Sequence, residues 1–228
     1  MKISVVVPAY NEEKRIKKCL DSLLSQETKA YEIIVVDNNC TDKTVSIVKK
    51  YKQVKIVHEK KPGITPARNA GFNAAKGDVI ARCDADSVMP KDWLRKVGND
   101  FKTQKDIVAV TPDFYLFDTP LVSKSLLPAN IFYSVSKMII KIPSLVGPCL
   151  AIKRSAWNKV KDELCDDDHE VHEDIDLAIH IAKYGKIYLD HDIVINMSGR
   201  RIMYNPKSFF GEYPIRLVKM LKSHRHLF

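Results

Sequence analysis

The sequence predicts an α/β fold with a Rossmann-like, mostly parallel sheet flanked by helices, and three observations support this prediction. First, short β-branched segments alternate with amphipathic helical segments along the first half of the chain. Second, two of the predicted strands lead into aspartates, Asp37 and Asp84, and open α/β sheets bind ligands at the carboxyl ends of their strands. Third, 228 residues with 45% hydrophobic content suffice for one large domain with a substantial core.

Four strands separated by helices are predicted in the first half. The strands are expected at Ile3–Val7, Ile33–Val36, Val54–Val57 and Val79–Cys83. Asn11 is a candidate N-cap for the first helix, whose apolar residues follow the i, i+3, i+4, i+7 spacing. The second helix is expected to begin at Thr41. The third is expected to begin at Thr65 and Pro66, to carry small residues along one face for close packing, and to end at Gly77.

The second half is less regular. Strands are expected at Ile107–Val110, Pro148–Ile152, Ile187–Leu189 and Ile193–Ile195. Residues 121–146 are apolar but interrupted by lysines and prolines, which predicts helical pieces or a lid. One helix is expected to start at Ser155. Another follows an acidic loop and is expected to run from His172 to Gly185.

Charge and cysteine content narrow the class of protein. The net charge is +9, and residues 200–228 hold seven Lys or Arg against one Glu, so they contribute 7 − 1 = +6. This basic end favours phosphate-bearing partners: a nucleotide, a nucleic acid or an anionic membrane. The five cysteines are odd in number and widely spaced, which predicts reduced thiols in a cytoplasmic protein. No stretch reaches the ~18 uninterrupted apolar residues of a membrane span.

Asp84-Ala85-Asp86 is the most informative segment, because it places two carboxylates directly after an apolar strand. Mg²⁺ and Mn²⁺ take oxygen ligands of this kind and share their coordination shell with substrate phosphates. The simpler alternative is that Asp86 or Ser87 caps a following helix. The segment therefore predicts either a metal site or a helix cap.

Five segments, in order and spacing, resemble family 2 glycosyltransferases of the GT-A fold. They are Pro8–Glu12, Asp37–Asp42 with Lys61–Gly71, Asp84–Ser87, Gly147–Arg154 and His172–Leu177. The resemblance covers about residues 1–200 and implies one GT-A domain there. Residues 1–110 would bind the nucleotide sugar and residues 111–200 the acceptor, and residues 201–228 would form a basic amphipathic C-terminal extension.

The resemblance implies a role for each motif. Asp174 would be the general base, with Glu173 beside it. Asp86, together with Asp84, would hold Mn²⁺ or Mg²⁺ on the diphosphate of a UDP- or GDP-linked sugar. The other implied substrate-binding residues are Pro8, Ala9, Tyr10, Glu12, Asp37, Arg68 and Ala85. Each motif also has a structural alternative: a partner for a helix dipole, an Asx-turn, an ion pair on a helix face or an acidic helix start.

The implied reaction is an inverting, metal-dependent transfer of a sugar to an acceptor hydroxyl, in glycan or glycolipid assembly. One carboxylate suffices as the base, because a metal stabilises the leaving diphosphate. A nucleotidyltransferase that makes nucleotide sugars is an alternative, but Pro8–Glu12 contains no glycine to cradle a triphosphate. A non-enzymatic nucleic-acid binder is disfavoured, because few aromatic residues interleave with the basic ones in the C-terminal extension.

Two basic features near the C-terminus remain open from sequence. Arg200 and Arg201 follow the last predicted strand and either contact the diphosphate or form a solvated turn. Residues 213–228 alternate apolar and basic side chains in the pattern of an interfacial helix. Such a helix would bring the protein to the cytoplasmic face of a membrane and to a lipid-linked acceptor. Packing of residues 213–228 on the core, or dimerisation through them, is the alternative.

Overall fold

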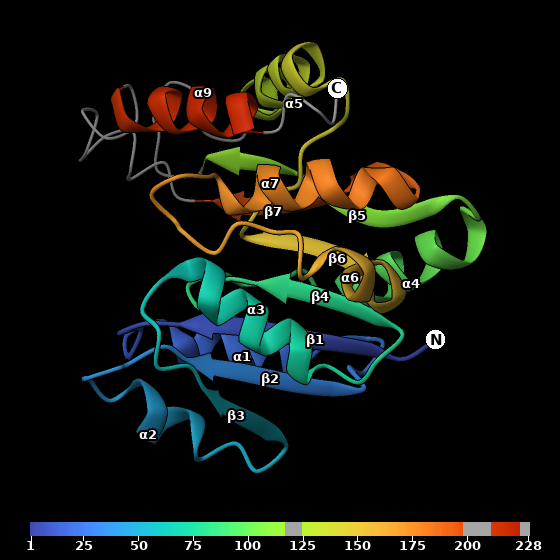
Figure 1. The fold of residues 1–228 in the computed structure, drawn as a ribbon. Helices are drawn as coiled ribbons and strands as arrows, with labels where there is room; N and C mark the ends of the chain where they lie inside the picture. The colour runs from blue at the N-terminus through green and yellow to red at the C-terminus, as the bar shows by residue number, and fades with distance from the viewer. Residues whose placement is uncertain (117–124, 198–210, 224–228) are drawn as a thin grey trace.

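The computed structural model describes residues 1–116, 125–197 and 211–223, and its centre is a seven-stranded sheet (Figure 1). The strand order is β3-β2-β1-β4-β6-β5-β7. The strands are β1 (Ile3–Ala9), β2 (Glu32–Asp37), β3 (Val54–His58), β4 (Val79–Cys83), β5 (Ile107–Leu116), β6 (Cys149–Lys153) and β7 (Lys186–Met197). Strands β1 to β4 are parallel to one another, β5 and β7 are parallel, and β6 runs antiparallel to both of its neighbours. The predicted α/β fold with a mostly parallel sheet is confirmed.

Helices cover both faces of this sheet (Figure 1). One layer packs around Trp93 and the other around Trp157, and both side chains are fully buried. The first layer contains α1 (Ile16–Leu24), α2 (Thr44–Val48), α4 (Trp93–Thr103) and α5 (Leu127–Ile140). The second contains α3 (Ile64–Ala74), α6 (Arg154–Val160) and α7 (Glu173–Ile181), which continues into the 3-10 turn η1 (Ala182–Tyr184). Helix α9 (Tyr213–Ser223) packs on a smaller cluster that includes Ile140 and Ile179.

The small-residue face of α3 packs closely on β1 and β2, as its sequence predicts. A Cβ atom at Gly71 would overlap the side chain of Val6 and would lie 2.8 Å from Cγ2 of Val36. Only glycine allows the helix this approach to the sheet. The close packing fixes the height of α3 above the strands, and therefore the position of Arg68 within it.

Two predicted helix starts are wrong, because contacts between loops outweigh local capping. Asn11 does not cap α1, which begins at Ile16; its backbone is left-handed, with φ of 53°. The Asn11 Oδ1 atom instead accepts a hydrogen bond of 2.8 Å from the backbone N–H of Thr41. Thr41 is therefore part of this loop contact, and α2 begins at Thr44.

Three other elements differ from the sequence-based expectation. Helix α3 begins at Ile64 rather than at Thr65–Pro66. The two short strands expected near the C-terminus form the single strand β7, with a register shift where it passes the Pro112–Asp113 step of β5. The described part of the broken apolar segment, residues 125–146, contains one continuous helix, α5, because Pro128 lies in its first turn, where a missing N–H costs little.

Candidate active site

Three parallel strands bring polar residues to one edge of the sheet. Ala9 and Asp37 are register partners at the ends of β1 and β2, and Asp84 follows the end of β4. Pro8 and Ala9 are buried, and the next residue, Tyr10, has 62% of its surface exposed. The edge thus combines buried backbone with one exposed aromatic ring.

The Asp84–Ser87 segment forms a tight turn at this edge. The backbone N–H of Ser87 donates to the carbonyl of Asp84 at 3.0 Å, and the N–H of Asp84 donates to the carbonyl of Pro148 at 3.2 Å. Asp84 and Asp86 are partly exposed, and Ala85 between them is buried. Helix α4 begins only at Trp93, so neither Asp86 nor Ser87 is its cap. The helix-cap alternative for this segment is wrong.

A buried ion-pair network connects the Asp84 turn to α7. Arg82 Nη2 donates to Asp84 Oδ1 at 3.1 Å, and Arg82 Nη1 donates to Glu173 Oε1 at 2.5 Å. Arg68 Nη1 donates to the other carboxylate oxygen of Glu173 at 2.5 Å and to its backbone carbonyl at 2.6 Å. The Arg68 side chain is completely buried and that of Arg82 is 2% exposed. The two guanidiniums therefore fix Glu173 from strand β4 and helix α3 at once.

Arg82 is not among the residues that the sequence predicts for the site, although it contacts both Asp84 and Glu173. It interrupts the apolar run of β4 two residues before Asp84, and residues two apart point to the same face of a strand. A charge in the middle of a buried strand almost always has an ionic partner. That combination is a signal that could have placed Arg82 beside Asp84, although not beside Glu173.

Asp174 lies at the N-terminus of α7, next to this network. Its Oδ1 atom accepts a hydrogen bond from the backbone N–H of Ile175 at 2.9 Å, and its Oδ2 atom accepts one from the N–H of Gly147 at 3.2 Å. A Cβ atom at residue 147 would lie 3.3 Å from Glu173 Oε1 and 3.4 Å from Asp174 Oδ2. Glycine thus keeps side-chain atoms out of the space beside both carboxylates.

Burial and neighbouring charges set the pKa values of these acids. Burial, reinforced by the charge of Glu173, raises the pKa of Asp174 to about 6. Burial also raises the pKa of Asp84, with a contribution from the charge of Asp86, and Arg82 opposes both. For Glu173 burial acts in the same direction, but the two guanidiniums outweigh it and hold its pKa below the usual value. Counting the described residues alone, Asp84, Asp86, Glu173 and Asp174 in ionised form against Arg68 and Arg82 give 2 − 4 = −2 charges.

The other predicted residues have defined contacts at or near this edge. The Asp37 carboxylate accepts from the backbone N–H of Cys40 at 2.9 Å and contacts Nδ1 of His58 at 2.9 Å, so the predicted local turn exists. Glu12 lies before α1 and pairs with Arg15 at 3.1 Å. Arg200 and Arg201 lie outside the described residues.

The N-terminus of α3 is held by an acid from a distant loop. The Asp168 carboxylate accepts hydrogen bonds from the backbone N–H groups of Ile64 at 2.7 Å and Thr65 at 3.1 Å, and from the Thr65 hydroxyl. This loop precedes α7, so its contact ties together the two helices that supply Arg68 and Asp174. The acidic loop is evident in the sequence, but its partner at the start of α3 is not.

The fold and the carboxylate-rich strand edge define an α/β protein of the GT-A type, and sequence comparison agrees. Residues 4–160 match the family model described as Glycosyl transferase family 2. This chain belongs to that family.

Its curated relatives are longer proteins. Glycosyltransferase GlyA of Streptococcus pneumoniae is 31% identical over 121 residues, which are 51% of this chain and 17% of GlyA. Glycosyltransferase AglE of Haloferax volcanii is 32% identical over 120 residues, which are 49% of this chain and 40% of AglE. The matched segments therefore span well under two thirds of either relative.

Solved structures share the fold across almost the whole chain. The mannosyltransferase PcManGT from Pyrobaculum calidifontis superposes with a TM-score of 0.74 at 22% identity, covering 99% of this chain and 64% of PcManGT. S. aureus TarS 1–349 gives 0.69 at 21% identity, covering 97% and 66%. M. tuberculosis glucosyl-3-phosphoglycerate synthase gives 0.69 at 18% identity, covering 97% and 80%. At these identities the similarity shows the fold alone.

Proposed function

We propose that this protein transfers a sugar from a nucleotide-diphosphate sugar to an acceptor hydroxyl, with a divalent metal ion and with inversion at the anomeric carbon. The observation that carries the proposal is the link from the Asp84–Asp86 turn, through Arg82 and Glu173, to Asp174. A turn that carries two carboxylates and a further carboxylate with a raised pKa thus lie next to each other. Inverting transfer needs these two elements, one for the leaving group and one for the acceptor.

The donor is proposed to be UDP- or GDP-linked. Among the structural neighbours, PcManGT was solved with GDP-Man and Mn²⁺, TarS with UDP-GlcNAc, and the M. tuberculosis synthase with Mn²⁺ and UDP. In this chain Tyr10 offers an exposed ring beside the buried backbone of Pro8 and Ala9, and Asp37 follows on the adjacent strand. These four residues are proposed to hold the nucleoside, and Ala85 to line the path to its diphosphate.

Mn²⁺ or Mg²⁺ fits the Asp84 turn. In the part of the chain that the structure describes, the four carboxylates of the site outnumber its two guanidiniums by two, and Asp84 has Arg82 as its ion-pair partner at 3.1 Å. Among the described residues, no three His, Cys, Asp or Glu side chains form a complete metal cage. Ions of this kind are commonly held by one or two carboxylates plus substrate phosphates. Asp86 and Asp84 are the proposed ligands, and the bound ion would stabilise the leaving diphosphate as a Lewis acid.

Asp174 is the proposed general base. Each of its oxygens accepts one backbone hydrogen bond and keeps a further lone pair for the proton of the acceptor hydroxyl. The oxygen of the acceptor hydroxyl forms a bond to the anomeric carbon while the bond from that carbon to the diphosphate breaks. The proton of the hydroxyl passes to Asp174. A pKa of about 6 leaves most of the carboxylate ionised at neutral pH and brings its basicity closer to the working range. Glu173, held by two arginines, positions the start of α7.

The experiment that tests this function measures release of nucleoside diphosphate from a panel of UDP- and GDP-sugars, with and without Mn²⁺. Asp86→Asn removes one anionic ligand and should weaken Mn²⁺-dependent donor binding by at least ~10-fold, since even indirect metal partners contribute that much. Asp106→Asn is the matched control, because Asp106 is exposed just before β5. Donor affinity that is independent of Mn²⁺, or unchanged in Asp86→Asn, would contradict the metal assignment.

A further inference from the structure

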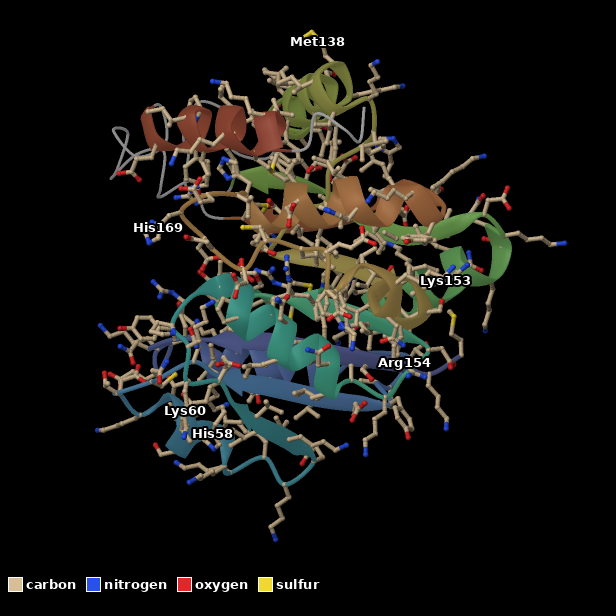
Figure 2. The ribbon with its side chains drawn as sticks, viewed as in Figure 1. His58, Lys60, Met138, Lys153, Arg154 and His169 are labelled. Atoms are coloured by element: carbon tan, nitrogen blue, oxygen red, sulfur yellow. The ribbon has the colours of Figure 1, made fainter. Side chains whose placement is uncertain are left out.

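Helix α5 has an apolar face that the described residues leave exposed. Leu127, Ile131, Val135 and Met138 have 53%, 55%, 42% and 76% of their surface exposed. Their spacing of four, four and three residues places them along one side of the helix, here called the α5 stripe. The opposite side buries Ala129, Tyr133 and Ile140 against the protein. Figure 2 shows Met138 at the outer limit of the molecule, pointing away from it.

Helix α9 continues this surface. It packs inward through Met220, which is fully buried in a cluster with Ile140 of α5 and Ile179 of α7. On its other side Ile215 and Val218, here called the α9 face, have 61% and 51% of their surface exposed. Helix α9 therefore packs on the core, which is one of the alternatives that the sequence leaves open for residues 213–228. It also presents apolar side chains outward. Figure 1 shows α5 and α9 together at the same end of the molecule.

The described charged residues within these two helices are all basic. Neither Leu127–Ile140 nor Tyr213–Ser223 contains an Asp or Glu. Lys137, Lys141 and Lys222 are exposed on or next to them. Lys219 is also exposed and pairs with Glu170 at 2.8 Å. The surface thus combines apolar side chains with three exposed lysines, and the described acids beside it are Glu212, just before α9, and Glu170, which pairs with Lys219.

We propose that the α5 stripe, the α9 face and Lys137, Lys141 and Lys222, together the α5–α9 surface, dock on an anionic lipid membrane. Exposed apolar side chains enter the boundary between headgroups and acyl chains, and lysines beside them attract anionic headgroups. No described helix is long and apolar enough to cross a bilayer. A second copy of the chain fits this surface less well, because a symmetric dimer would bring together two sets of three exposed lysines with only Glu212 of each copy beside them to pair.

The docking surface is physically connected to the proposed base. His172, the residue before Glu173, contacts the backbone carbonyl of Tyr213 through Nε2 at 2.9 Å, and the two rings lie 4.7 Å apart. Lys219 of α9 pairs with the loop before α7 through Glu170. A membrane bound at α9 therefore lies beside the element that carries Asp174. This consequence rests on the proposed function, and it favours an acceptor carried by a lipid.

Vesicle co-sedimentation tests the docking without any assay of catalysis. The protein should sediment with vesicles of phosphatidylcholine and phosphatidylglycerol at low salt, far less with phosphatidylcholine alone, and less at high salt. Each lysine near an anionic surface contributes about a fivefold factor in affinity. Lys137→Glu/Lys222→Glu should therefore bind about 30-fold more weakly or worse. Ile131→Glu/Met138→Glu should remove binding even at low salt, because it places charges in the apolar stripe.

Matched controls carry the same changes at the opposite end of the molecule. Lys49→Glu/Lys50→Glu reverses two exposed lysines after α2, and Tyr31→Glu places an acid on a 48% exposed aromatic residue before β2. Both should bind vesicles like the unmodified protein, and all variants should keep its melting curve. Absence of co-sedimentation at low salt, or equal binding by Lys137→Glu/Lys222→Glu, would overturn the proposal. So would a solution dimer that Ile131→Glu/Met138→Glu dissociates, since a second copy would then occupy this surface.

Turnover measurements separate this proposal from the proposed function. Loss of vesicle binding with intact Mn²⁺-dependent turnover of a soluble acceptor would leave the transferase assignment standing and remove only the membrane docking. Vesicle binding by a protein that turns over no nucleotide sugar would support the membrane docking and contradict the transferase assignment.

Discussion

The two halves of the sheet hold their functional residues in different ways. In the first half, β1, β2 and β4 are parallel and lie side by side, so residues at their ends meet at one edge without further help. In the second half, β6 runs antiparallel between β4 and β5, and helix α7 brings the carboxylates of Glu173 and Asp174 to the site. These two carboxylates are held by side chains from β4 and α3 and by the backbone of the loop at Gly147.

Because of this difference, the two halves of the site should differ in their sensitivity to single substitutions. The first half presents its groups through strand topology, which many side-chain changes leave intact. The second half depends on a few buried contacts that link distant parts of the chain, above all Arg82 with Glu173. The proposed base, Asp174, should therefore respond more strongly to single changes in this network than the proposed donor-binding edge does. Four predictions test that contrast.

The largest effect is expected on the catalytic rate when Asp174 is changed to Asn. The variant keeps the shape of the side chain but cannot accept a proton, so turnover should fall by about 10²–10⁴-fold. Donor affinity, measured by titration calorimetry, should stay close to that of the unmodified protein. Near-normal turnover would place the base elsewhere, with Glu173 as the next candidate. Asp176, the other acid of this helix, is fully buried.

The next effect concerns the contact between the halves. Arg82→Met removes one guanidinium from a buried network and leaves Glu173 and Asp84 incompletely paired. The free energy of unfolding, measured with urea, should fall by about 3 kcal/mol, as is typical when one partner of a buried pair is lost. Arg95→Met is the control: its side chain is 54% exposed, so its two ion pairs should contribute less than about 1 kcal/mol. Equal stability of the two variants would show that the Arg82 network does not join the halves.

The third prediction is a pH dependence. The base must be deprotonated to work, and the pKa of Asp174 is raised to about 6 by burial and by Glu173. The value of kcat/KM should therefore be level above that pH and fall about tenfold per pH unit below it. For stability the sign is opposite: the raised pKa favours the folded state at low pH, and this contribution is lost as pH rises through about 6. An acidic limb near pH 4 instead would mean that Asp174 titrates like a solvated aspartate, or that another group is the base.

The smallest effect is expected at the start of α3. Asp168→Ala removes the acceptor for two backbone N–H groups and the Thr65 hydroxyl, which should lower the free energy of unfolding by about 1–2 kcal/mol. Asp166→Ala is the matched control in the same loop, where an exposed pair with Lys61 should contribute less than about 1 kcal/mol. If the two substitutions have the same effect, the cap does not stabilise α3. Turnover should fall only modestly, because the contact acts through Arg68.

Much of the first half could be predicted because its information is local. The strands β1 to β4 are short, β-branched runs, and each was placed to within two residues at either end. The strand-end motifs Asp37 and Asp84–Asp86 follow directly from that pattern, since parallel strands share an edge. Helix starts were less predictable. At Asn11 and Ile64 the backbone conformation is set by hydrogen bonds to residues 41 and 168, which are far along the chain.

By itself, the sequence determined the fold class, the strands that end at the site, the acids at those ends and the family. These follow from hydrophobic periodicity and from short motifs, which each need only a few neighbouring residues. Only the tertiary structure decided which charges meet: that Arg82 and Arg68 share Glu173, that Gly147 leaves space beside Asp174, and that α9 buries Met220 while leaving Ile215 outside. The physical reason is that pairing in a low-dielectric interior depends on distances between segments far apart in the chain, and local sequence patterns do not carry those distances.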